Sequence, residues 1–168
     1  AFLLVLITIS LYIAFVFRKV SHPVSSWKYG AVTLVTLFHD ALIPVGLFAV
    51  LGRFGRAEVD VNFIVAILVV MGFSVHDTIV VFDRIREHLR NARGAPDFSA
   101  LVNASVNETI ARSVNTSLTL ALVLVAPFLF GSETLRPFVL TILVGIIVGT
   151  YSSIFVASPL LTIWKKKE

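Results

Sequence analysis

Long apolar stretches dominate this chain and recur five times. They cover residues 1–17, 29–51, 61–82, 113–130 and 137–164. A membrane-spanning helix needs roughly 20 mostly apolar residues to cross a hydrocarbon core about 30 Å thick. The pattern therefore predicts an all-α, polytopic membrane protein, in which residues 1–168 form a single transmembrane domain of five helices.

The longest connector, residues 83–112, is polar but periodic, which predicts two helices. The first continues the third apolar stretch and ends before the sequence Gly-Ala-Pro at 94–96. Asp97 is suited to cap a second helix, whose apolar positions then repeat at helical spacing as far as Ile110 and which runs into the fourth span. Opposite charges three residues apart favour the first helix. These pairs are Asp83 with Arg86 and Glu87 with Arg90.

The basic residues indicate how the spans are oriented. Eleven of the 14 Lys and Arg residues lie in connectors of one side or in the tail at 165–167, and three lie on the other side. Because the side richer in basic residues stays in the cytoplasm, we expect the 83–112 connector and the C-terminus to be cytoplasmic. Residue 1 is then expected outside, and the chain is expected to be part of a longer one.

Composition agrees with lipid as the solvent. Hydrophobic residues make up 57% of the chain and charged residues 14%, against about 25% charged in a typical soluble domain. The net charge of +4 is not taken as a sign of nucleic-acid binding, because the basic residues lie beside apolar runs. The chain has no cysteine, and we find no phosphate loop, metal motif or nucleophile–base arrangement. We therefore expect neither an enzyme nor a cofactor.

Asp77 is the strongest candidate for a functional residue, because it lies inside the third apolar stretch, about five residues from its cytoplasmic end. A charge near the bilayer centre costs at least about 2.5–3.5 kcal/mol. Asp77 is either a structural ion-pair partner, a permanently neutral carboxyl, or a carboxyl that gains and loses a proton. Burial and a nearby cation have opposite effects on the ionisation of an acid, so a movable cation allows switching.

Arg112 is the expected cation, since it stands at the mouth of the fourth span at about the depth of Asp77. Thr116 and Thr119 share its helical face, with Asn115 beside them. This polar stripe is a candidate wall for a hydrated path. The alternative is an arginine that reaches the interface and anchors the helix end.

Asp40 is a weaker candidate near the middle of the second span, beside His39. Pro44 follows four residues later and has no N–H, so the carbonyl of residue 40 loses its helical partner. The two readings are a polar transport site at a broken helix or a simple kink. His39 and His76 are interpreted as hydrogen-bonding spacers or, as the alternative, proton relays. In the fifth span, Gly145, Gly149, Ser153 and Ala157 recur at every fourth position and predict a close packing seam.

Four segments resemble SecF, of the SecD/SecF family of protein-export membrane proteins, which is related to the RND transporters. The most specific is GFSVHDTIVVFDRIRE at residues 72–87. The other segments are His39–Asp40, NETIARS at 107–113, and VGTYSSIFVASP at 148–159. His76 departs from the Asn that we expect in many relatives, which puts the properties of Asp77 or the choice of coupling ion in question.

The resemblance implies one half of an RND-like membrane domain, lacking the family's first span and periplasmic domain. It implies a bacterial inner-membrane subunit that works with SecD beside the SecYEG channel and uses proton, or alternatively sodium, flow to drive late export of unfolded polypeptides. Asp77 would carry the proton, Arg112 would be its basic partner, and Asp40 would have a lesser role. The alternatives are a scaffold that conducts no ions, and an RND-type exporter of small molecules or lipids.

Overall fold

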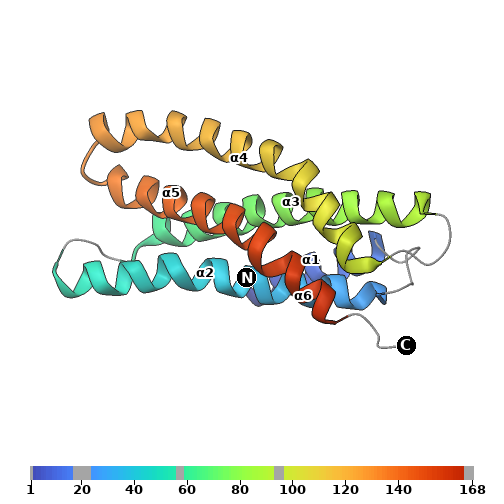
Figure 1. Ribbon diagram of the computed structural model, residues 1–168. Helices are drawn as coiled ribbons and strands as arrows, with labels where there is room; N and C mark the ends of the chain where they lie inside the picture. Colours follow the sequence, from blue (N-terminus) through green and yellow to red (C-terminus); the bar gives the residue numbers. More distant parts are fainter. Residues whose placement is uncertain (1, 17–23, 56–58, 93–96, 165–168) are drawn as a thin grey trace.

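The computed structural model describes residues 2–16, 24–55, 59–92 and 97–164, and these form a bundle of helices (Figure 1). No strand occurs in these ranges, so the predicted all-α fold is confirmed. The helices in chain order are α1 (Phe2–Val16), α2 (Ser26–Arg53), α3 (Val61–Asn91), α4 (Phe98–Phe130), α5 (Leu135–Ser152), the π-helix η1 (Ser153–Ala157) and α6 (Ser158–Ile163).

Four helical runs are long and apolar enough to cross a membrane. They are α2, α3, α4 and the continuous run from α5 through α6, and they correspond to four of the five predicted apolar stretches. The first predicted span forms α1, which packs on α2. Its 15 residues extend only about 22 Å, which is less than the thickness of the hydrocarbon core.

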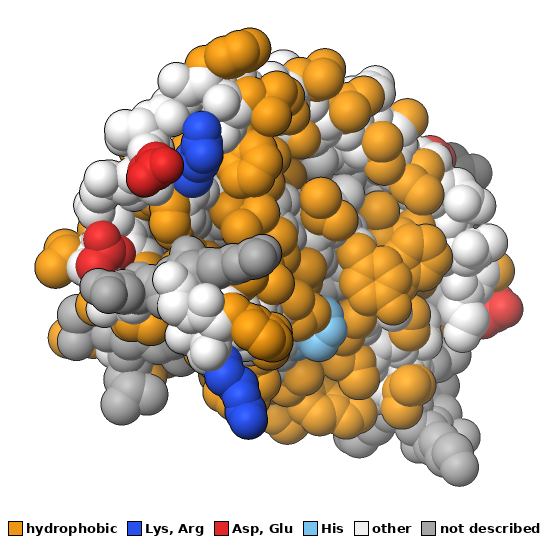
Figure 2. Space-filling view, turned by 90° about the vertical axis from the view of Figure 1, so that its left-hand side faces the viewer, with side chains coloured by type: hydrophobic (Ala, Val, Ile, Leu, Met, Phe, Trp, Pro, Cys, Tyr) orange, Lys and Arg blue, Asp and Glu red, His pale blue; other side chains and the backbone are white. Residues whose placement is uncertain are grey.

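The helix ends gather at two ends of the bundle. The end of α2, the start of α3, the end of α4 and the start of α5 lie at one end, at the left of Figure 1, which we call the short-loop end. Figure 2 views this short-loop end, whose surface is mostly apolar with few charged side chains. The last turns of α3 and the first turns of α4 lie at the opposite end together with α6 (Figure 1). We call this second end, which carries the charged residues between 83 and 112, the charged end.

Local side-chain contacts set the starts of α3 and α4. The Asp60 carboxylate accepts a hydrogen bond from the Phe63 N–H at 2.8 Å, and the Asp97 carboxylate accepts one from the Ser99 N–H at 3.1 Å. Each bond satisfies an N–H that the first helical turn leaves without a partner. The cap predicted at Asp97 is confirmed, whereas the expected helix stop at 94–96 lies outside the described residues.

The charged end contains one predicted ion pair and one that differs from the prediction. Arg86 pairs with Asp83 at 2.6 Å, as expected. Glu87 pairs with Arg84 at 2.5 Å, so the predicted pair between Glu87 and Arg90 is wrong. The reason is tertiary: Arg84 also pairs with Glu108 of α4, and this contact holds its guanidinium between the two acids.

The glycine seam of α5 packs directly against α3. An added Cβ at Gly145 would lie 2.1 Å from Val70 Cγ2, and one at Gly149 would lie 3.1 Å from Ser74 Cβ. Ser153 and Ala157 continue the seam and are fully buried. The predicted packing seam is therefore confirmed, and it brings the backbone of α5 close to α3.

The helix that follows the seam changes its hydrogen-bonding pattern at Ser153–Ala157, which forms one π turn. Pro159 lies just beyond this turn and has no N–H to donate back into it. The Ser158 hydroxyl donates instead to the Ser153 carbonyl at 3.1 Å. Single π turns of this kind are frequent at functional sites.

Candidate functional site

Asp77 lies where three helical elements meet. Its side chain is buried, with 5% of the residue exposed. Oδ1 accepts a hydrogen bond from the Ser113 hydroxyl of α4 at 2.6 Å, and Oδ2 accepts one from the Ser153 hydroxyl of η1 at 2.6 Å. Because each carboxylate oxygen is bonded to a different neighbouring helix, Asp77 joins α3 to both α4 and η1.

Asp40 has an arrangement of the same kind on the other side of the α3–α5 contact. It is fully buried, and its Oδ2 accepts hydrogen bonds from the Ser74 hydroxyl of α3 and from the Ser152 hydroxyl of α5, the latter at 2.6 Å. Oδ1 lies 2.9 Å from Nδ1 of His39. The sequence indicated Asp40 and His39 but gave no sign of the two serines.

Helical periodicity explains how α4 presents a hydroxyl to Asp77. Its inward face carries a hydroxyl residue at every fourth position, and Ser113 and Ser117 are the two that lie within the apolar span. Ser117 also contacts the Thr150 hydroxyl of α5. The complete set is Ser105, Thr109, Ser113 and Ser117.

The predicted polar stripe of α4 lies on a different face. Arg112, Asn115, Thr116 and Thr119 are all exposed. The two threonine hydroxyls donate to carbonyls of their own helix, at 2.9 Å and 2.8 Å. The stripe therefore does not face Asp77, and the α4 side chain that bonds to Asp77 belongs to the serine face.

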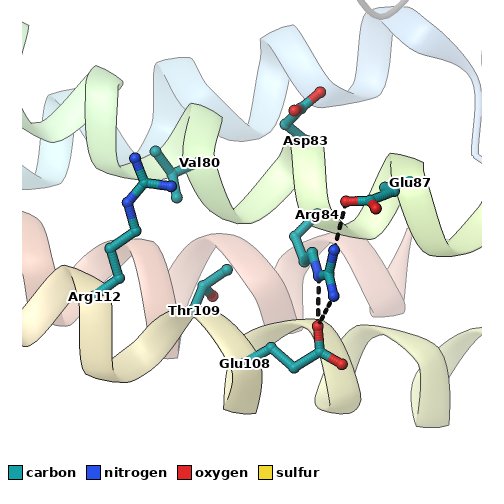
Figure 3. A pocket seen from close by; sticks show the side chains of 7 residues that line it. All are labelled: Val80, Asp83, Arg84, Glu87, Glu108, Thr109 and Arg112. Atoms are coloured by element: carbon teal, nitrogen blue, oxygen red, sulfur yellow. Dashed lines mark hydrogen bonds and ion pairs between the residues drawn. The ribbon is translucent and has the colours of Figure 1, made fainter.

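Arg112 also does not contact Asp77. Among the described residues no ion pair joins its guanidinium to a carboxylate. Figure 3 shows the side chain extending toward Val80 of α3, in a pocket of about 280 Å³. The pocket is lined by Val80, Asp83, Arg84, Glu87, Glu108, Thr109 and Arg112. The expected contact of acid and guanidinium is replaced by hydroxyl contacts, while a role for Arg112 stays a prediction.

This pocket at the charged end approaches Asp77 from one side. Val80 follows Asp77 by three residues, which is about 4.5 Å along the helix axis. Thr109 precedes Ser113 by one turn on the same inward face of α4. Two of the lining residues, Val80 and Thr109, therefore lie about one helical turn from Asp77 and from its partner Ser113 in their own helices.

The two histidines differ in their surroundings. His76 is exposed on α3, whereas His39 is partly buried and contacts Asp40. Within the described ranges no group of three acidic, histidine or cysteine side chains is close enough together to hold a metal ion. The chemistry that these contacts support is the exchange of hydrogen bonds around two carboxyl groups.

Apolar helices long enough to span a bilayer, with carboxyl groups buried between hydroxyls, define a polytopic membrane domain that holds ionisable groups inside its bundle. The model of the family described as protein export membrane protein SecD/SecF, C-terminal, matches residues 1–167. The chain therefore belongs to the SecD/SecF family.

Individual relatives agree with this assignment. The chain is 52% identical over 157 residues to the protein translocase subunit SecF of Thermobaculum terrenum, covering 94% of this chain and 48% of that protein. It is 46% identical over 138 residues to the SecF subunit of Synechocystis, covering 82% and 44%. The chain thus spans about half the length of these curated relatives.

A solved structure shares the fold. The crystal structure of SecDF in its super-membrane-facing form matches with a TM-score of 0.80 and 41% sequence identity, and the match covers 95% of this chain and 20% of the other. The protein translocase subunit SecDF of Thermus thermophilus is 41% identical over 160 residues, with coverages of 95% and 20%. The expected membrane fold of the family is confirmed.

Proposed function

We propose that this chain is the membrane part of an auxiliary subunit of the Sec protein translocase, in which reversible protonation of Asp77 couples the proton gradient to late export of polypeptides. The observation that carries the proposal is the burial of Asp77 between a hydroxyl of α4 and a hydroxyl of η1. The family assignment supplies the export context. The chain itself would act in transport and not as an enzyme.

Protonation of Asp77 would change how these helices are joined. The carboxylate accepts hydrogen bonds on both oxygens, whereas the protonated acid must donate one from the oxygen that carries hydrogen. Ser113 or Ser153 would then have to accept where it now donates. Binding of a proton shifts the equilibrium between two helix packings only as far as these packings differ in their affinity for the proton. We propose that this change in packing transmits the energy of the gradient.

The pocket at the charged end supports a route for the proton. It is lined by Arg112 and the Arg84–Glu108 pair, and also by Val80, which follows Asp77 by about one turn of α3. We propose that water enters here and that Arg112 sets the electrostatic potential at the entrance or pairs with an acid of a partner. Sodium is the alternative coupling ion.

The cellular setting follows from the relatives and from the basic residues. The name of the Thermus relative joins SecD with SecF, which supports SecD as the partner, with SecYEG and the unfolded polypeptide as further partners. The family assignment supports the bacterial inner membrane, and the distribution of Lys and Arg supports a cytoplasmic position for the charged end and the C-terminus. Membrane lipid would cover the apolar outer faces of the helices.

The test is an export assay in vesicles that contain the full-length protein with its partners under an imposed pH gradient. Asp77→Asn keeps the size of the side chain but cannot exchange a proton, so we expect it to lose the gradient-dependent part of export. Glu133→Gln is the control, because Glu133 is an exposed acid between α4 and α5 that does not line this pocket, and it should export like wild type.

The same assay separates the competing scaffold hypothesis. If Asp77→Asn loses export only together with its association with SecD, the residue acts through assembly and the scaffold hypothesis gains support. If the variant assembles and still exports at the wild-type rate under the gradient, proton coupling through Asp77 is refuted. No observation on this chain favours the small-molecule or lipid exporter.

A further inference from the structure

Two consecutive residues connect the two buried acids. The Ser152 hydroxyl donates to Asp40 Oδ2, and the Ser153 hydroxyl donates to Asp77 Oδ2, each at 2.6 Å. The acids belong to different helices, α2 and α3, whereas the two serines share one peptide bond where α5 passes into η1. Movement of this peptide therefore affects both carboxyl groups together.

Each of these serines has a second acceptor within reach. Ser152 Oγ lies 3.1 Å from the Gly149 carbonyl oxygen, and Ser153 Oγ lies 3.0 Å from the Thr150 carbonyl oxygen. A hydroxyl has a single hydrogen and two acceptor lone pairs. It donates either to the carboxylate or to the backbone, and in the second orientation it is free to accept a hydrogen bond from a protonated acid.

Because Asp40 is buried, it can change its charge only if its hydrogen-bond partners can both donate and accept. It is fully buried, and two serine hydroxyls together with His39 provide its side-chain contacts. Pro44 lies inside α2 four residues later, so the Asp40 carbonyl has no helical donor. Neutral hydroxyls satisfy both the charged and the protonated acid, whereas a bound cation would favour the charged form alone.

The other titratable groups around the pair are few. His39 contacts Asp40. His76 directly precedes Asp77 in α3, and Arg112 directly precedes Ser113 in α4. The sequence of α1 has no charged residue, and α5 and η1 have none after Arg136. The Ser152–Ser153 pair therefore links the two acids through hydrogen bonds, and Ser74, three residues before Asp77 in α3, also bonds to Asp40.

We propose that Asp40 is a second proton-binding carboxyl and that the Ser152–Ser153 pair couples its protonation to that of Asp77. The proposal rests on the function proposed above. A proton taken from water converts the Asp40 carboxylate to the acid, the acid donates to Ser152, and Ser152 turns its hydrogen to the Gly149 carbonyl; release of the proton to water reverses each step. The change at Ser152 is passed through the shared peptide to Ser153 and so to Asp77.

The proposal is tested by infrared difference spectroscopy of the full-length protein in lipid vesicles during a pH titration, because the C=O stretch of a protonated carboxyl is resolved there. We expect two bands from buried carboxyls, one lost in Asp40→Asn and the other in Asp77→Asn. Two interacting groups titrate as a pair, so Asp40→Asn should also move the pH midpoint of the remaining band.

Two hydroxyl variants test the connection without altering either acid. Ser152→Ala should reduce the shift that Asp40→Asn causes. Thr141→Val is the control, because this buried threonine of α5 donates to the Pro137 carbonyl and not to a carboxylate, and it should leave the shift unchanged. If Ser152→Ala leaves the shift at its full size, the serine pair is not the coupling element and the proposal is overturned.

The outcomes also separate this proposal from the proposed function. If only the band of Asp77 is seen, and Asp40→Asn keeps gradient-driven export while Asp77→Asn loses it, the inference about Asp40 is wrong and the function of Asp77 stands. If Asp77→Asn exports normally, the proposed function fails. Loss of gradient-driven export in both Asn variants, with two coupled bands, supports both proposals.

Discussion

Replacing Gly145 with alanine should force α3 and α5 apart at Val70. The new Cβ would lie 2.1 Å from Val70 Cγ2, 2.5 Å from Cγ1 and 2.8 Å from Cβ, whereas carbon atoms in contact stay about 3.5–4.0 Å apart. Rotation about χ1 of Val70 cannot remove the overlap, because the Cβ atom does not move with that rotation. The backbone must therefore shift, and overpacking of this kind costs about 1–3 kcal/mol.

A matched glycine isolates this cost. Gly72 lies in the facing helix α3, and an added Cβ there meets nothing within 4 Å. Both replacements gain the higher helix propensity of alanine, worth about 1 kcal/mol in a helix interior. The difference in stability between Gly145→Ala and Gly72→Ala therefore measures the overlap with Val70, and Gly72→Ala should be at least as stable as wild type.

The assay is unfolding of the purified full-length protein in detergent, followed by circular dichroism. Gly145→Ala should unfold first, and adding Val70→Ala should recover part of the loss, because it removes both γ carbons but leaves Cβ at 2.8 Å. Equal stability of Gly145→Ala and Gly72→Ala would refute the close contact of the two helices. So would a double variant that is no more stable than Gly145→Ala alone.

Two further changes test single contacts. Thr78→Val should leave the unfolding temperature unchanged or raise it, because the buried Thr78 hydroxyl has no hydrogen-bond partner in the described part of the chain and an unsatisfied buried donor costs about 1–3 kcal/mol; a clear decrease would show that the hydroxyl is bonded. Arg84→Gln removes the exposed pairs with Glu87 and Glu108, so it should lower the unfolding temperature slightly at low salt and not at all in about 1 M salt. A loss that persists at high salt would mean that Arg84 stabilises the protein by packing.

The helices could be predicted from the sequence because their signals are local. Apolar runs of sufficient length gave α2, α3, α4 and the α5–α6 run, and an acid before a periodic segment gave the cap at Asp97. The pair of Glu87 with Arg84 could not be found in this way. Spacing along one helix allows Glu87 two partners, and the choice between them depends on Glu108 of another helix.

The partners of Asp77 were missed for a related reason. Arg112 and Ser113 are adjacent in sequence, so their side chains point about 100° apart around the helix axis. Arg112 is the more prominent residue in an apolar span, but Ser113 is the one that faces Asp77. A repeat of hydroxyl residues at every fourth position of α4 was the available signal, and it is weak because serine and threonine often bond to their own helix.

The choice of partners determines what the buried acids can do. A guanidinium against Asp77 would stabilise its charged form and oppose the uptake of a proton. Serine hydroxyls accept as readily as they donate, so Ser113 and Ser153 can satisfy the acid in both of its states without bringing a charge into the bundle. Serine is also small, which allows α5 to approach α3 as closely as Gly149 requires. The same residue type is therefore compatible with both proton exchange and close helix packing, and Arg112 lines the pocket at the charged end instead of contacting the acid.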